Sequence, residues 1–239
     1  MLLIVRAALF YLGYALVTIV WGGFWALFAW LLPYRTRFHV VIGLWTRYCL
    51  WWLRVTCGVR CRIDGLENLP ERPCIVLSRH ESTWETLFLQ TLLAPQATLI
   101  KRELLRIPFF GWAFRTLRPI AINRKEPRAA LRQLIREGGE RLDNGVWVVL
   151  FPEGTRLAHG ERRKFQPGGA ALASATGHPI VLVVHDAGRF WPAHAVLKRP
   201  GTVQVLISKP IETRGCSTQE VQARVATEFD RLLGLLPAH

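Results

Sequence analysis

A histidine and a carboxylate stand five residues apart in this 239-residue sequence, at His80 and Glu85. An apolar run precedes them at 74–78 and another follows at 87–89, a pattern that predicts a buried strand, a short loop and a helix. In open α/β folds, ligands bind beyond the carboxyl ends of the strands. The pair is therefore well placed for chemistry.

The spacing of the pair restricts its geometry. On one continuous helix the two side chains would lie about 140° apart, so contact requires His80 to lie in the loop before the helix. Ser82 can serve as the N-cap, with Glu85 at the third helical position. The same Ser-x-x-Glu spacing leaves an alternative open, because a capping box needs Glu85 only to accept from the backbone N–H of Ser82.

A second cluster, Phe-Pro-Glu-Gly-Thr-Arg at 151–156, follows the apolar run 146–150. Gly154 lets the backbone approach a ligand, Thr155 offers a hydroxyl, and Arg156 offers a forked guanidinium suited to phosphate. Glu153 can orient that arginine or accept from a substrate hydroxyl.

Basic groups also follow two other apolar runs. Lys101 comes after 97–100, and Asn123 and Arg124 come after 119–122. These groups can bind an anion, although a solvated basic rim is the simpler explanation for any one of them.

Six apolar runs predict strands, and several lack polar alternation, as strands buried on both faces do. They lie at 74–78, 97–100, 119–122, 146–150, 179–184 and 203–208. Helical patterns lie between and after them, one ending near Gly145 and one starting at Ser217-x-x-Glu220. The alternation predicts an α/β fold with a largely parallel central sheet flanked by helices.

The N-terminal part differs from the rest of the chain. Residues 7–32 carry no charged side chain, a length that can cross a hydrocarbon core of about 30 Å. Gly22 and Gly23 leave a bend or re-entrant hairpin open. A second apolar stretch at 40–53 contains Arg47 and predicts an interfacial segment, with a core helix as the alternative. We therefore predict a membrane-anchoring helical segment at 1–54 and an α/β catalytic domain at 55–239.

The formal net charge of +14 lies almost entirely outside the first 32 residues, whose only charged side chain is Arg6. Such a surface favours anionic headgroups, phosphate-bearing substrates or acidic carrier proteins. Nucleic acid is a poor explanation, because no recognised binding motif accompanies the charge. Arg35 and Arg37 predict, by the positive-inside bias, that the catalytic domain lies on the cytoplasmic side of the inner membrane.

The remaining cysteines and histidines suggest no further chemistry. Five cysteines form no paired framework and no set with zinc-site spacing, so neither a metal nor a cofactor is expected. The sequence assigns no role to four histidines, His159, His178, His185 and His194.

Taken together and in order, His-x4-acid, the Ile-Asn-Arg run, Phe-Pro-Glu-Gly-Thr-Arg and the Pro-Ile-Val strand at 179–181 resemble the four motifs of the glycerolipid acyltransferase family. The resemblance is specifically to its bacterial 1-acyl-sn-glycerol-3-phosphate acyltransferases, over about residues 55–210. Two departures stand out. Glu85 replaces the usual Asp, which adds a methylene, and Asn123 replaces an Asp, which removes a charge but leaves Arg124.

The resemblance implies transfer of a fatty acyl group from acyl-CoA or acyl-carrier protein to the sn-2 hydroxyl of lysophosphatidic acid, giving phosphatidic acid. It implies His80 as the base with Glu85 as its partner. It further implies a phosphate site formed by residues from three clusters, namely Lys101, Arg124, Glu153, Gly154, Thr155 and Arg156. Membrane lipid is then a further partner. Aromatic residues at 109, 110, 112 and 114 can line an acyl groove, although core packing is the commoner fate of such residues.

Two alternatives to this reaction stay open. One is acyl transfer to another acceptor, such as glycerol 3-phosphate or a lyso-aminolipid. The other is a non-catalytic, membrane-anchored binder of anionic lipid, in which Glu85 only caps a helix. Acyl-chain length preference and the identity of the donor are not encoded in any motif of the sequence.

Overall fold

The computed structural model describes residues 1–123 and 125–237, and Arg124, a candidate phosphate ligand, therefore lies outside the described residues. Their strands form a seven-stranded sheet in the order β1-β7-β6-β2-β5-β3-β4. All neighbouring strands in it run parallel except β6 and β7, which are antiparallel. The strands are β1 Val59–Asp64, β2 Ile75–Ser78, β3 Gln96–Lys101, β4 Ile120–Ile122, β5 Trp147–Leu150, β6 Ile180–His185 and β7 Gly201–Ile207.

The predicted α/β class and the largely parallel sheet are confirmed. All six predicted strands form, each within three residues of its expected ends. Strand β1 is the one that the apolar runs did not reveal, because it lies at the sheet edge and alternates Arg60, Arg62 and Asp64 with apolar residues. Such an edge strand lacks the continuous apolar run that marks a strand covered on both faces.

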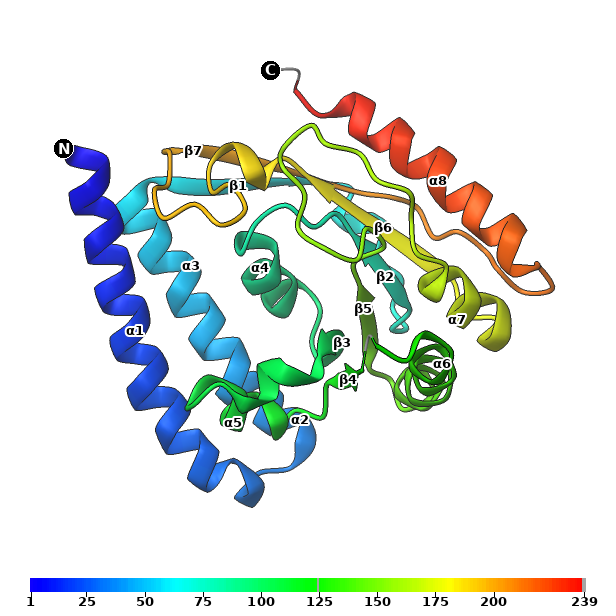
Figure 1. The fold of residues 1–239 in the computed structure, drawn as a ribbon, viewed down its shortest axis with the longest axis horizontal. Helices are drawn as coiled ribbons and strands as arrows, with labels where there is room; N and C mark the ends of the chain where they lie inside the picture. Colours follow the sequence, from blue (N-terminus) through cyan, green and yellow to red (C-terminus); the bar gives the residue numbers. More distant parts are fainter. Residues whose placement is uncertain (124, 238–239) are drawn as a thin grey trace.

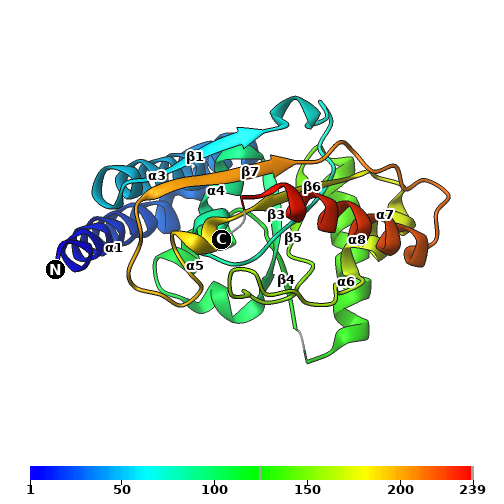
Figure 2. The same ribbon diagram turned by 90° about the horizontal axis from the view of Figure 1, so that it is seen from above.

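Helices cover both faces of the sheet (Figures 1 and 2). They are α1 Leu2–Phe28, α2 Tyr34–Arg37, α3 Leu44–Cys57, α4 Trp84–Leu92, α5 Phe110–Arg115, α6 Pro127–Asp143, α7 Gly168–Thr176 and α8 Thr218–Leu235. One core layer joins α1, α3, α4 and α5 to one face of the sheet, and a second joins α6, α7 and α8 to the other. Buried strand residues alternate between these layers, Val76 and Val149 on one side and Ile75 and Leu77 on the other.

The last helix begins as its sequence predicts. Ser217 caps α8 by accepting from the N–H of Glu220, and the Glu220 carboxylate accepts from the N–H of Ser217. Its buried residues Val221, Val225 and Phe229 follow the helical period and pack on the sheet.

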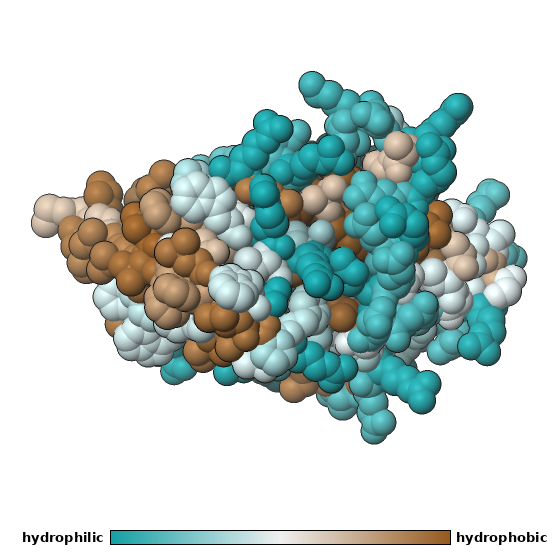
Figure 3. Space-filling model, turned by 90° about the horizontal axis from the view of Figure 1, so that it is seen from below, coloured by the Kyte–Doolittle hydropathy of each residue, from teal (hydrophilic) through white to brown (hydrophobic). Residues whose placement is uncertain are grey.

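The N-terminal helix is continuous through Gly22 and Gly23, so no hairpin forms there. A Cβ on Gly22 would lie only 3.1 Å from the carbonyl oxygen of Phe109, and the missing side chain lets the segment before α5 approach α1 closely. The helical span Leu2–Leu31 is long and apolar enough to cross a membrane. Figure 3 shows this apolar surface at one end of the molecule, beside a largely hydrophilic remainder.

Helix α1 is also packed along its length against the rest of the chain. Indole N–H groups of Trp52 and Trp21 donate to the carbonyl of Leu9 (3.1 Å) and to that of Val41 (3.0 Å), respectively. Helix α3 buries Trp45, Cys49 and Leu53 in the same core layer as the sheet, which favours a core helix over a purely interfacial segment for this stretch. Residues 1–54 therefore share one hydrophobic core with the strands.

Candidate active site

The histidine–carboxylate pair forms at the carboxyl end of β2. Strand β2 ends at Ser78 and α4 begins at Trp84, so His80 lies in the intervening loop, as the spacing requires. The helix starts one residue later than a Ser82 N-cap would place it, with Thr83 at the N-cap position. The Ser82 hydroxyl instead accepts from the N–H of Trp84, at 3.1 Å.

The two predicted functions of Glu85 coexist in one oxygen atom. His80 Nδ1 lies 2.7 Å from Glu85 Oε1, and the same oxygen accepts from the backbone N–H of Ser82 at 3.0 Å and of Glu81 at 3.2 Å. A carboxylate can only accept, so Nδ1 carries the hydrogen and Nε2 is left as the basic nitrogen. The His80 ring stacks on Phe151, with the ring centroids 4.0 Å apart.

Glu153 also forms a hydrogen bond with the loop that carries His80. Its Oε2 accepts from the backbone N–H of His80 at 2.7 Å, and its Oε1 lies 3.5 Å from the guanidinium of Arg79. Burial raises the pKa of Glu153 to about 7, against the opposite effects of the His80 N–H and of the Arg79 charge. Because its carboxyl is buried and used within the protein, Glu153 contacts the pair rather than the open site.

A cavity with an empty volume of about 1540 Å³, open solvent included, lies beside the pair. Its polar lining includes His80, Lys101, Gly154, Thr155 and Arg156, so five of the predicted site residues share one cavity. Apolar residues from several helices and two strands line its remainder, including Ile42, Trp45, Leu87, Leu99, Phe110, Phe114 and Val149.

Phe110 and Phe114 line this cavity as expected for an acyl groove, whereas Trp112 is about half exposed on the molecular surface. Phe109 is likewise at the surface, against Gly22 and Gly23 of α1.

The cationic side of the cavity is more open than the pair. Lys101 and Thr155 are exposed, and Arg156 is half-buried. The Nε of Arg156 is buried and has no hydrogen-bond partner among the described residues. An incoming anion can satisfy such a donor, which fits a phosphate.

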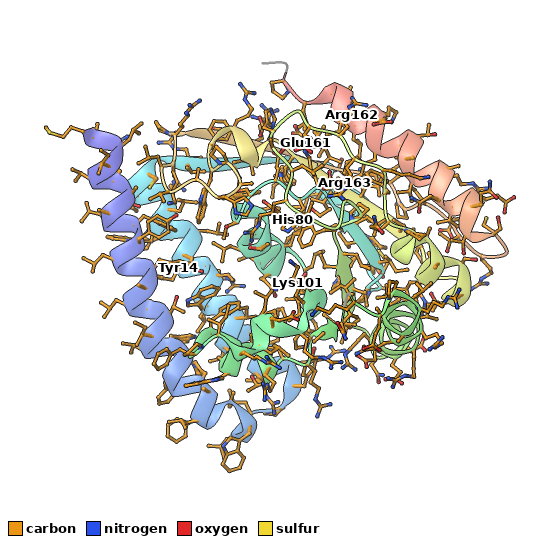
Figure 4. All side chains as sticks on the ribbon, in the orientation of Figure 1. Tyr14, His80, Lys101, Glu161, Arg162 and Arg163 are labelled. Atoms are coloured by element: carbon orange, nitrogen blue, oxygen red, sulfur yellow. The ribbon has the colours of Figure 1, made fainter. Side chains whose placement is uncertain are left out.

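Sequence reasoning missed Tyr14, which lines the cavity from α1 (Figure 4). Its position in a charge-free apolar helix gave no sign of a role near the site. The N-terminal segment thus contributes a wall of the cavity as well as the exposed apolar surface.

Sequence reasoning also missed a buried charged cluster behind the pair. Arg79 Nε donates to Glu81 Oε2 at 2.8 Å, and the side chain of Glu81 also contacts His159 Nδ1 (3.2 Å) and accepts from the N–H of Gly188 (2.8 Å). His185, the last residue of β6, is fully buried beside them. The signal that could have found it is the one used elsewhere, a polar residue at the end of a buried strand.

The 156–164 loop is tied to this cluster. Arg79 Nη2 donates to the carbonyl of Glu161 at 3.2 Å, and Arg162 pairs with Asp230 of α8 at 2.9 Å. Figure 4 shows Glu161, Arg162 and Arg163 on this loop. The loop that carries Arg156 is thereby fastened at its far end.

Comparison with known proteins gives a consistent result. The family model described as Acyltransferase matches residues 60–186. The 1-acyl-sn-glycerol-3-phosphate acyltransferase of Pseudomonas aeruginosa is 46% identical over 211 residues, covering 88% of this chain and 82% of that protein. The chloroplastic 1-acyl-sn-glycerol-3-phosphate acyltransferase LPAT1 of Arabidopsis thaliana is 29% identical over 206 residues, which cover 83% of this chain and 56% of the plant protein.

A solved structure has the same fold over nearly the whole chain. The crystal structure of the 1-acyl-sn-glycerophosphate (LPA) acyltransferase of Thermotoga maritima matches with a TM-score of 0.80 and 25% identity, covering 99% of this chain and 98% of that one. The likeness includes the N-terminal helices as well as the sheet, since so little of either chain lies outside it.

Proposed function

The chain belongs to the acyltransferase family, and from that membership we propose that it transfers a fatty acyl group to the sn-2 hydroxyl of 1-acyl-sn-glycerol 3-phosphate, forming phosphatidic acid in phospholipid biosynthesis. The observation that carries the proposal is the 2.7 Å contact between His80 and Glu85 beside a cavity that is cationic on one side and apolar elsewhere. A lysophospholipid is complementary to such a cavity, because it has an anionic phosphate group and an apolar acyl chain.

His80 acts as the general base in this proposal. An alcohol hardly ionises near neutral pH, so the sn-2 oxygen attacks the thioester carbonyl as His80 Nε2 takes its proton. Glu85 holds the proton on Nδ1 and stabilises the imidazolium that forms. Collapse of the tetrahedral intermediate expels the thiolate, which takes the proton back from Nε2, so the histidine is regenerated.

The acceptor phosphate binds to Lys101, Thr155 and Arg156, with Gly154 allowing close approach of the backbone. The predicted role of Arg124 rests on the motif resemblance, since that residue lies outside the described residues. Glu153 serves this site indirectly, because its carboxyl binds the His80 backbone and lies near Arg79.

The acyl chain of one substrate occupies the apolar part of the cavity. The donor is a thioester, either acyl-CoA or acyl-carrier protein, and the basic surface suits either anionic carrier. No step of this reaction requires a metal or a redox cofactor.

The apolar face of α1 suggests membrane association, and we propose the cytoplasmic face of the inner membrane as the location, from Arg35 and Arg37. Residues 1–54 then anchor the protein, and residues 55–239 supply the sheet with its catalytic loops. One side of α1 packs against α3 and α5, and its other side, which is apolar and exposed, faces the lipid in this proposal.

The test is an assay of the full chain in detergent with lysophosphatidic acid and labelled acyl-CoA or acyl-carrier protein. We expect labelled phosphatidic acid from at least one donor. Glycerol 3-phosphate and a lyso-aminolipid serve as competing acceptors in the same assay. Binding of lysophosphatidic acid without product from either donor would instead support the non-catalytic binder.

A further inference from the structure

The buried charged cluster behind the catalytic pair contains a fully buried histidine, His185, to which the reaction above gives no role. His185 is the last residue of β6, and its side chain is fully buried against the start of α4. The centroids of its ring and of the Trp84 ring are 5.9 Å apart. Its neighbour Asp186 is engaged elsewhere, with Arg189 and with the N–H of Gln204. A polar ring in such a place needs partners for both nitrogens.

The ring lies between two carboxylates. His185 Nε2 is 3.0 Å from the carbonyl oxygen of Arg79, to which it donates, and 4.0 Å from Glu85 Oε2. His185 Nδ1 is 3.7 Å from Glu81 Oε1. It is therefore the group that joins the catalytic carboxylate to the second buried carboxylate.

The amide N–H of Ala187 competes for the same ring nitrogen, at 3.3 Å from His185 Nδ1. A neutral ring accepts from Ala187, whereas an imidazolium donates toward Glu81. The surrounding charges decide between these two states. Glu81 and Glu85 are both fully buried, and the fully charged neighbour Arg79 is directed at Glu81 and Glu153.

Burial works against a charged His185, but the carboxylates of Glu81 and Glu85, 3.7 and 4.0 Å from its ring nitrogens, outweigh it, and the pKa of His185 is raised. Burial likewise works against a charged Glu81, but His185 and Arg79 lower its pKa to about 2. His159, which contacts Glu81 from the 156–164 loop, is partly exposed, so solvent screens its interaction with that carboxylate.

The two carboxylate oxygens of Glu85 differ in their hydrogen-bond partners. Oε1 accepts from His80 and from two backbone N–H groups, whereas Oε2 is buried and has no hydrogen-bond partner among the described residues. A buried carboxylate oxygen without a donor favours protonation of the carboxyl group unless a positive charge lies nearby. Beside Oε2, that charge can come from His185.

We propose that His185 is a positioning residue: its imidazolium, held between Glu81 and Glu85, keeps Glu85 ionised so that Oε1 can serve as the partner of His80. As a step of the acyl transfer this rests on the proposed function. Its electrostatic part, the charge on a buried ring, does not.

The first test compares His185→Gln with His178→Gln in the full chain. His178 is the matched control, because it also faces a carboxylate, Asp143, at 3.7 Å, but it lies on a loop away from the cavity. We expect His185→Gln to lower kcat roughly tenfold or more with little change in either KM. The variant also loses the positive charge of His185 near Glu85. The acid limb of the pH profile of kcat/KM should therefore move to higher pH, by about one unit. His178→Gln should match the parent protein in both.

A double-variant measurement separates this role from simple support of the fold. If His185 acts through Glu85, adding His185→Gln to Glu85→Gln should lower kcat less than twofold further. Losses that multiply, or a kcat loss with an unchanged pH profile, would overturn the proposal.

Nitrogen NMR of the ¹⁵N-histidine-labelled parent protein in detergent decides the charge directly, even if His185→Gln does not fold. We expect both ring nitrogens of His185 to be protonated at pH 7. A neutral ring would sink the inference. A protein that shows the charged ring but forms no phosphatidic acid would refute the proposed function and leave the charge assignment standing.

Discussion

The two sides of the cavity are prepared to different degrees. On the first side, His80 lies on a loop whose N–H groups are already bonded to two buried carboxylates, those of Glu153 and of Glu85 at the start of α4. On the other side, Lys101 and Thr155 are exposed, and Arg156 keeps a buried Nε without a partner among the described residues. The difference indicates that the pair which we propose to react is fixed before substrate arrives, while the proposed phosphate site keeps a donor for the phosphate to satisfy.

The largest expected effect tests the prepared side. His80→Ala removes the base, and kcat should fall by about 10²–10⁴-fold, the range typical of a lost general base, with little change in either KM. The measurement is single-turnover formation of labelled phosphatidic acid. His178→Ala serves as a control and should behave like the parent protein. A His80→Ala variant that keeps more than a tenth of the parent rate would mean that the base is another group.

Glu85 should show how much of that preparation is charge. Glu85→Gln keeps an oxygen acceptor for the loop but loses the charge that stabilises the imidazolium, and we expect kcat to fall by roughly 10²-fold, with a melting temperature close to that of the parent. Glu85→Asp keeps the charge with a shorter reach and should fall between the two. Equal kcat in Glu85→Gln and the parent would leave Glu85 as a helix-start residue only.

The open side should respond in binding rather than in chemistry. Arg156→Ala removes a charged hydrogen-bond donor, so the KM for lysophosphatidic acid should rise about tenfold or more while kcat changes little. Thr155→Val should raise it less, because a neutral hydroxyl contributes less than a guanidinium. A change confined to the KM of the acyl donor would place the phosphate elsewhere and remove the contrast between the two sides.

The smallest effect concerns stability and the buried supports of the loop. The pKa of Glu153 is raised from 4.5 to about 7, mainly by burial, so its carboxyl group ionises at a lower pH in the unfolded chain than in the folded protein. Between these two values the free energy of unfolding falls as pH rises, by up to about 3 kcal/mol from this group.

Glu153→Gln removes this dependence but keeps an acceptor for the His80 N–H. The melting temperature of the variant relative to the parent should therefore rise from pH 5 to pH 8, as measured by thermal unfolding in one detergent. A difference that is constant over this range would show that Glu153 is ionised in the folded protein throughout.

Much of the fold follows from local patterns, because strands buried on both faces and capped amphipathic helices leave direct traces in the sequence. Strand β1 left no such trace, since it is an edge strand with charged alternate residues. The stretch 40–53 was ambiguous for a related reason. Its tryptophans suit an interface, and only the three-dimensional packing of Trp45 and Leu53 shows that one face is core.

The candidate site was predictable where its residues end strands and only there. His80, Lys101 and Thr155 follow apolar runs in the sequence and meet at one cavity. Tyr14 lines the same cavity from the N-terminal helix, and no local spacing encodes such a contact. His185 ends β6 and so carried the same local signal as His80, but no role was predicted from it. The choice between capping and pairing for Glu85 was likewise undecidable from spacing, because a single oxygen serves both.

Helix α1 has a practical consequence through Tyr14 and the core layer that it shares with the sheet. A shortened protein beginning near residue 55 would not be a soluble version of the same enzyme, because it would lose one wall of the reaction chamber and uncover the apolar surface beneath. Substitutions intended only to change detergent behaviour would, on the inward face of α1, also reshape the cavity in which we propose that an acyl chain binds. Solubility and substrate choice therefore have to be engineered together in this protein.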